Sequence, residues 1–137
     1  MIVAGQASLW VSSKTRRVVD VGPLLDLEPT SSWEHGDRIT HITTEERYRV
    51  NSHWVFRVES IPDEDGSEGT PWLERLIDIL EPRRERLALL TQDYSAHIHW
   101  TAEFDSSQWS LEIQPELVVR LGALGLPVSF RADEIDE

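Results

Sequence analysis

Two histidines, His97 and His99, alternate with apolar residues in a segment that ends near Glu103. Alternate residues of a strand point to the same side, with Cα atoms roughly 7 Å apart, so the two imidazoles can reach one metal ion. The sequence dictates no third ligand, since His53 would have to lie on a neighbouring strand. We therefore expect neither a bound metal nor another cofactor.

A larger set of polar and aromatic residues follows the same alternation in several predicted strands. If helices cover one face of the sheet, these residues share the other face. A tryptophan among arginines and histidines can stack a flat ligand or anchor a partner side chain there. The alternative is an ordinary solvated face with cross-strand charge pairs. The residues expected on this open face are Trp10, Arg49, His53, Arg57, His97, His99, Glu103, Glu112 and Arg131.

The segment Trp33-Glu34-His35-Gly36-Asp37 is a third candidate, as a small site on a loop. We favour a structural interpretation, in which Trp33 closes the sheet edge, Gly36 adopts a positive φ and Asp37 hydrogen-bonds the turn backbone. Aromatic residues beside turns usually serve packing. For the same reason we place Trp54, Trp72, Trp100 and Trp109 in the core.

Residue patterns for catalysis are missing from the sequence. The chain has no cysteine, no Gly-x-Ser-x-Gly elbow, no His-Glu-x-x-His helix and no phosphate-binding glycine loop. Asp63, Glu64 and Asp65 are adjacent but fall in a predicted loop, whereas acid–base carboxylates need rigid, partly desolvated surroundings. No pattern therefore argues for an enzyme.

The formal charge of −12 is concentrated in two short segments. Residues 59–70 hold five acidic residues and the tail 133–137 holds four; the rest of the chain carries 16 acidic and 13 basic residues. An acidic protein is a poor nucleic-acid binder. Charged segments usually serve solubility, and the alternative is an acidic surface that meets a basic protein.

The length and composition fit a single globular domain over residues 1–137. Hydrophobic residues make up 39% of the chain, which includes six tryptophans, so a sizeable core is expected. No signal peptide or membrane-spanning stretch is visible. We expect a cytoplasmic protein that does not bind membranes.

Periodicity predicts alternating strands and helices. Strands are predicted at 7–12, 48–58, 95–104, 109–114 and 126–132, with 95–104 and 109–114 forming a hairpin. A helix-like stretch spans 17–27, a helix opens at Thr70-Pro71 and is broken at Pro82, and two more span 83–92 and 115–124. Gly125 suits a left-handed helix end.

This order predicts an α+β fold: two layers, with helices on one face of a mostly antiparallel sheet of about five strands, ferredoxin-like in character. The sequence does not fix strand order or oligomeric state. An edge strand such as 7–12 would be able to pair two chains.

The block Leu25-Asp26-Leu27-Glu28-Pro29-Thr30, followed by Trp33 and Gly36-Asp37, resembles Leu-Gly-Leu-Glu-Pro-Thr…Trp…Gly-Asp in a bacterial family called domain of unknown function 4279. The resemblance extends over most of the chain, through the central Trp-containing strand, the helix pair and the closing helix and strand. It implies a bacterial protein and supplies a fold without an activity. This chain has Asp26 where the family usually has glycine. Aspartate can replace glycine at a left-handed position, at some cost in free energy.

Two hypotheses for function follow. The first is a non-enzymatic protein-interaction module of the toxin-neutralising (immunity) type, in which the acidic loop steers a basic partner. Its candidate contacts are Asp63, Glu64, Asp65 and Glu68, together with the tail. The second is a small-ligand-binding domain that uses the open face, with Trp10 as the platform and Arg49, His53, Arg57 and His99 as polar anchors.

Overall fold

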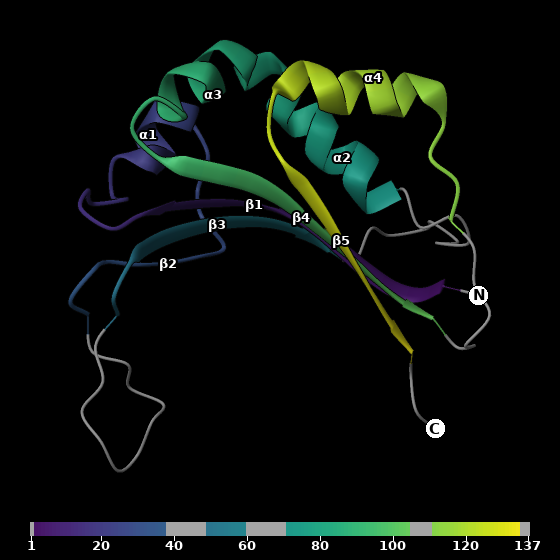
Figure 1. Cartoon of the computed structure of the whole chain (residues 1–137), viewed down its shortest axis with the longest axis horizontal. Coiled ribbons are helices and arrows are strands. Elements are labelled where there is room, and N and C mark those ends of the chain that lie inside the picture. The colour runs from purple at the N-terminus through teal and green to yellow at the C-terminus, as the bar shows by residue number, and fades with distance from the viewer. Residues whose placement is uncertain (1, 38–48, 60–70, 105–110, 135–137) are drawn as a thin grey trace.

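The computed structural model describes residues 2–37, 49–59, 71–104 and 111–134. Within these residues the chain forms one five-stranded sheet with helices packed on one face (Figure 1). The strands are β1 (Ile2–Ser13), β2 (Ser31–Trp33), β3 (Ser52–Glu59), β4 (Ser95–Phe104) and β5 (Val128–Glu134). The helices are α1 (Val21–Leu25), α2 (Pro71–Leu80), the 3-10 turn η1 (Glu81–Arg83), α3 (Arg84–Leu90) and α4 (Pro115–Leu124).

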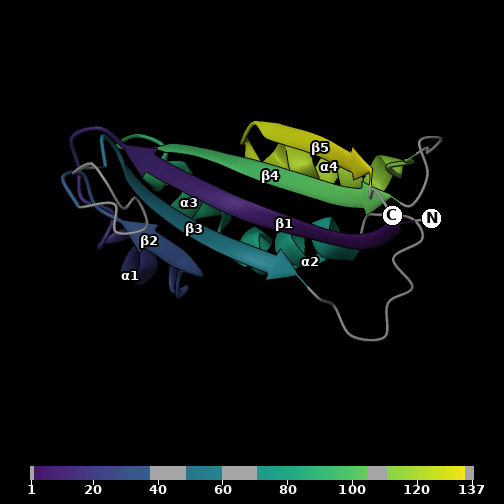
Figure 2. The same cartoon turned by 90° about the horizontal axis from the view of Figure 1, so that it is seen from below.

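The strand order is β2-β3-β1-β4-β5, so the first strand lies in the centre of the sheet. Neighbouring strands from β2 to β4 are antiparallel, and β3, α2 and β4 form a split βαβ unit with β1 between the two parallel strands, as in ferredoxin-like folds. β5 then adds in parallel to β4, after the crossover helix α4 (Figure 2). The structure confirms the predicted α+β fold with a mostly antiparallel sheet.

The central position of β1 corrects one expectation. Residues 7–12 were predicted as an edge strand that would be able to pair two chains, but they pair with β3 on one side and β4 on the other. The edges of the sheet are β2 and β5.

The core lies between the sheet and the helices. Every second residue of the central strands faces the helices, as in Leu9 of β1 and Ile98 of β4, both fully buried. The spacing of Leu73, Leu76, Ile77 and Leu80 at i, i+3, i+4 and i+7 predicts one apolar stripe on α2. This stripe packs against the sheet, and all four side chains are fully buried. Trp54, Trp72 and Trp100 also lie in this core, as predicted, whereas Trp109 lies outside the described residues.

Local sequence signals explain the helix ends. Asp26 follows α1 with φ 54°, the left-handed conformation that was expected at this position from the resemblance of the block to the family. Gly125 ends α4 in the same way, with φ 70°. Pro82 interrupts the predicted helix pair as a 3-10 turn between α2 and α3. The Arg83 guanidinium fixes this turn to α1, donating to the carbonyls of Leu25 (2.7 Å), Ile79 (2.7 Å) and Asp26 (3.2 Å).

Other predictions were wrong in detail. Residues 111–114 have no strand structure, so the expected hairpin does not form in the described part of 109–114, and β4 pairs instead with β1 and β5. The strand predicted over 48–58 begins only at Ser52, and Val50 is 77% exposed. The spacing of Leu117, Val118, Leu121 and Leu124 predicts one apolar side for α4, but Val118 is 53% exposed. Residues 60–70, with most of the acidic loop, lie outside the described residues, and so do 135–137 of the tail.

Candidate functional site

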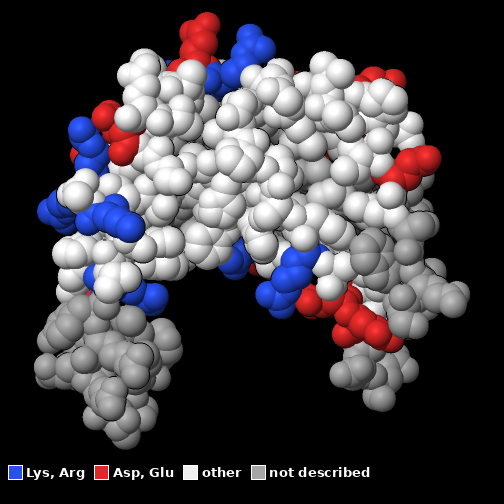
Figure 3. Space-filling view, in the orientation of Figure 1, with Lys and Arg blue, Asp and Glu red and all other residues white. Residues whose placement is uncertain are grey.

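The face of the sheet opposite the helices is uncovered by any other described element. The sheet arches, and its helices lie on the convex side, so the open face is concave (Figure 1). Figure 3 shows the molecule hollowed on this side, with charged side chains of both signs near the hollow. A concave surface with half-buried side chains is the main candidate for a functional site.

Four ring side chains form a continuous aromatic row across four neighbouring strands of this face. Trp33 of β2 stacks on His53 of β3, with ring centroids 5.0 Å apart and planes at 13°. The Trp10 ring of β1 makes T-shaped contacts with His53 and with Trp33, whose ring centroids lie 5.9 Å and 6.4 Å away, respectively. On its other side Trp10 stacks on His97 of β4 at 6.3 Å and 19°. Arg49 caps the row, with its guanidinium carbon 4.3 Å from the centroid of Trp33.

Hydrogen bonds fix the middle of the aromatic row. The Trp10 indole N–H donates to the Ser8 hydroxyl (3.0 Å), which in turn donates to the carbonyl of His99 (3.3 Å). Ser8 is only 2% exposed, so this bond satisfies a polar group that is shielded from water. The orientation of the Trp10 ring is therefore set by the sheet itself.

The turn after β2 holds the Arg49 end of the row. Gly36 N–H donates to the carbonyl of Arg49 (2.8 Å), and the N–H of Arg49 donates to the carbonyl of Asp37 (2.7 Å). The Asp37 carboxylate accepts from the N–H of Glu34 (2.8 Å), and Gly36 has φ 90°, as the structural interpretation of this turn predicted. The Glu34 carboxylate is bound elsewhere, by Arg17 Nε (2.9 Å) and by the N–H of Val18 (2.6 Å).

Both histidines of the row favour the neutral form. Burial lowers the pKa of His53, and the nearby Arg49 guanidinium and His97 lower it further. Burial also lowers the pKa of His97, with a smaller contribution from His99. At pH 7 the row therefore presents uncharged rings, and its one cationic group is Arg49 at the end.

The structure brings together only some of the residues predicted for this face. Trp10, Arg49, His53 and His97 lie in or beside the aromatic row. His99 lies on the side towards β5, where its Nδ1 is 2.8 Å from the Ser129 hydroxyl. Glu103 is exposed at the far end of β4, opposite Ala4.

Three further positions complete the predicted set. Arg57 lies farther along β3, opposite Ser8, with an enclosed Nε that has no hydrogen-bond partner in the described part of the chain. Arg131 of β5 pairs with Asp133 (3.0 Å). Glu112 was expected on a hairpin strand but lies in the segment before α4, and it accepts a hydrogen bond from Gln114 (3.2 Å).

Trp33 was not predicted for this face. It was predicted to close the sheet edge, and it does lie in the edge strand β2. Its half-exposed ring nevertheless joins the aromatic row through His53. A three-residue strand shows too little alternation to reveal which side its tryptophan faces.

A metal site is not supported by the described residues. No group of three or more potential ligands comes together among them. His97 and His99 share one face, as expected from their spacing, but one is stacked on Trp10 and the other is bound to Ser129.

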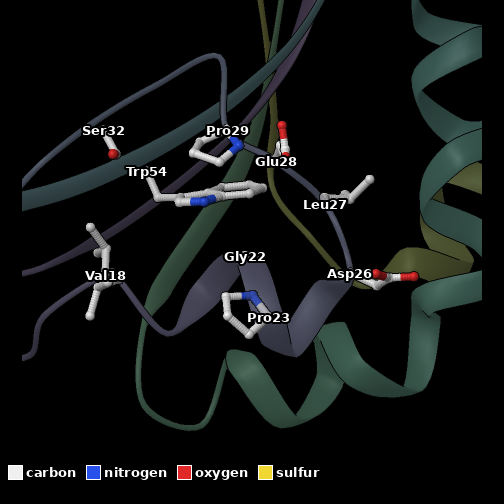
Figure 4. Close-up of a pocket in the computed structure, with 10 residues that line it drawn as sticks. Val18, Gly22, Pro23, Asp26, Leu27, Glu28, Pro29, Ser32 and Trp54 are labelled. Carbon is white, nitrogen blue, oxygen red and sulfur yellow. The ribbon is translucent and has the colours of Figure 1, made fainter.

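A separate groove of about 510 Å³ lies on the helix side, between α1 and the segment that leads into β2 (Figure 4). Trp54 lies between Pro29 on one side and Gly22 and Pro23 on the other. Its indole N–H is enclosed and has no hydrogen-bond partner among the described residues. Besides apolar residues, the groove is lined by Asp26, Glu28 and Ser32, so it offers polar contacts as well.

The fold and the row define a two-layer α+β domain with an exposed aromatic surface on its concave face. The chain belongs to the family described as Domain of unknown function (DUF4279), whose model matches residues 3–133. No curated protein and no solved structure matches the chain. No helix in the described residues is long and apolar enough to cross a membrane.

Proposed function

We propose that the protein is a non-enzymatic interaction module that binds a partner protein on the concave open face. The observation that supports this proposal is the aromatic row. Its Trp10, Trp33 and Arg49 belong to the residue types that dominate binding energy at protein interfaces. These side chains are already held in place, so little side-chain entropy is lost when a partner covers them.

The shape of the row favours a protein partner over a small molecule. Small ligands usually bind in enclosed pockets of several hundred Å³, whereas the row is spread across four strands of an open sheet. A convex partner surface fits the arch of the sheet. The half-buried, uncharged imidazoles lose little hydration when they are covered.

The acidic loop, residues 59–70, supports a more specific proposal about the kind of partner. Asp63, Glu64, Asp65 and Glu68 concentrate negative charge, and such charge accelerates association with a basic partner. A toxin-neutralising role in the cytoplasm is one function that requires rapid capture of a basic protein. In this proposal the loop sets the association rate, and the aromatic row sets the lifetime of the complex.

The test compares variants of the two regions. A double variant, Trp10→Ala with Arg49→Ala, is used as bait in a lysate of the source organism beside the unchanged protein. A matched control, Arg86→Ala with Leu89→Ala, removes similar groups from the exposed surface of α3. We expect the open-face variant to lose the partner and the control to retain it. Equal capture by both variants would contradict the proposal.

The captured partner then allows the loop to be tested. Replacement of the four acidic residues with serine should slow association and flatten its dependence on salt, with little change in the dissociation rate. If that variant instead dissociates faster, the loop is part of the bound interface. Circular dichroism of each variant establishes that the fold is retained.

The open face also supports a second candidate function, the binding of a flat anionic ligand. Trp10 would supply the platform, and Arg49 would supply the charge. A thermal-shift screen of aromatic acids tests this candidate. If this function is correct, an aromatic acid raises the melting temperature of the unchanged protein and of the serine-substituted loop variant. The same compound leaves the melting temperature of the Trp10→Ala/Arg49→Ala variant unchanged.

A further inference from the structure

The groove between α1 and the segment that leads into β2 has the size and the lining of a small-molecule site (Figure 4). Its volume of about 510 Å³ falls within the range of roughly 300–1,000 Å³ that is typical of ligand pockets. Such pockets combine a mostly apolar lining with a few polar groups that orient the ligand. The apolar side chains here are those of Val18, Val19, Pro23, Leu27, Pro29 and Trp54, and Asp26, Glu28 and Ser32 supply the polar groups.

Both walls of the groove are held in place by the fold. The N–H of Leu27 donates to the carbonyl of Gly22 (3.1 Å), which joins the two walls at the turn after α1. A Cβ atom added at Gly22 would lie 2.9 Å from the Leu27 carbonyl oxygen, so glycine is needed for this close approach. The N–H of Thr30 donates to the carbonyl of Val55 in β3 (2.7 Å) and fixes the second wall. A ligand therefore enters a site whose backbone is already ordered.

The two ends of the groove differ in charge. Figure 4 shows Asp26 and Glu28 on one side of Trp54 and Val18 on the other. Within the described ranges, neither carboxylate forms an ion pair, and neither accepts a side-chain hydrogen bond. The groove therefore has an apolar end and an anionic end.

Two basic side chains next to the groove are bound to other groups. Arg17, which precedes the lining residue Val18, pairs with Glu34 at 2.9 Å. The Arg83 guanidinium reaches the turn after α1, but it donates to three backbone carbonyls rather than to a carboxylate. The anionic end can therefore accept a positive charge from a ligand.

We propose that this groove binds a small organic cation with an apolar body. The apolar body lies along Val18, Pro23 and Trp54, and the cationic group meets the carboxylates of Asp26 and Glu28. A neutral molecule of the same shape gains only the burial of its apolar surface, and an anion is repelled. The groove lies on the helix side of the sheet, so this inference does not depend on the partner proposed for the open face.

A titration with phenylbutylamine, a protonated amine with an apolar body, tests the location of the site. The indole N–H signals of the tryptophans, followed by nuclear magnetic resonance, report on it. The Trp54 N–H lies at the floor of the groove, whereas Trp10 lies on the opposite face of the sheet. We expect the Trp54 signal to shift to saturation and the Trp10 signal to stay in place, with Trp54→Phe and Trp10→Phe assigning the two. An unchanged Trp54 signal, or an equal shift of both, would overturn the proposal.

The role of charge is tested with phenylbutanol, the uncharged analogue of the amine. We expect the unchanged protein to bind the amine about fivefold more tightly than the alcohol, as two solvent-exposed carboxylates allow. The variant Asp26→Asn with Glu28→Gln should bind both compounds equally, and asparagine is tolerated at the left-handed position.

A matched control, Glu74→Gln with Glu116→Gln, removes the same charge from exposed positions on α2 and α4. It should keep the preference for the amine. Equal affinity of the unchanged protein for amine and alcohol would contradict the proposal. The same conclusion follows if the control loses the preference as fully as the groove variant, since the attraction then belongs to the net charge of the protein.

Discussion

His97 and Ile98 are neighbours in β4, yet they lie in different environments. Ile98 is fully buried beneath the helices, while His97 is half-exposed on the open face and stacks on Trp10. The helices of the same chain cover the side of the sheet on which Ile98 lies. On the open side the rings pack against one another, and no described element covers them. The two faces of one sheet thus separate the residues that stabilise the fold from those available for binding.

The largest expected difference in unfolding free energy is the one between substitutions of these two neighbouring residues. Ile98→Ala leaves a cavity between the sheet and the helices and should lower the free energy of unfolding by about 2–5 kcal/mol. His97→Ala removes one stacked ring and should cost about 1 kcal/mol or less. Urea titration of both variants measures the difference. Similar losses would mean that the open face contributes as much to stability as the covered face.

A smaller effect is expected at the contact of β1 with α2. A Cβ atom added at Gly5 would lie 2.6 Å from the Trp72 ring, so Gly5→Ala must displace this buried side chain. We expect a loss of about 1–3 kcal/mol in unfolding free energy. Gly122→Ala is the control, since nothing lies within 4 Å of its added Cβ, and it should stabilise α4 by about 0.5–1 kcal/mol. Thermal unfolding in the same buffer compares the two.

The smallest expected effect is a pH dependence of stability that arises only from side chains of the open face. The pKa values of His53 and His97 are lowered in the folded protein, so the unfolded chain binds protons first as the pH falls below about 6.5. Stability should therefore be highest in neutral solution and decline between pH 7 and pH 5. The variant His53→Gln with His97→Gln should show a flatter dependence in urea titrations. An unchanged slope would show that these imidazoles do not contribute to it.

Alternation in the sequence was sufficient to place Trp10, His53 and His97 on one side of the sheet. Their contacts depend on strand order and register, which bring β3, β1 and β4 side by side and are not encoded by periodicity. Trp33 was missed because its strand has only three residues.

The parallel addition of β5 was missed for another reason. The polar segment 105–108 has the composition of a hairpin turn, so local chemistry favoured an antiparallel partner for β4. The structure pairs β4 instead with a strand beyond the next helix. The left-handed conformation of Asp26 was predicted correctly, because it depends on a short motif at a helix end.

The central position of the first strand has a consequence for how the chain is made. β1 is synthesised before the other four strands of the sheet, but it pairs with β3 and with β4, and Ile2 pairs only with Phe104. The apolar side of β1 therefore remains uncovered until most of the chain has emerged from the ribosome. We expect nascent chains that end before β4 to remain protease-sensitive and to recruit chaperones. The sheet then closes in one late, cooperative step.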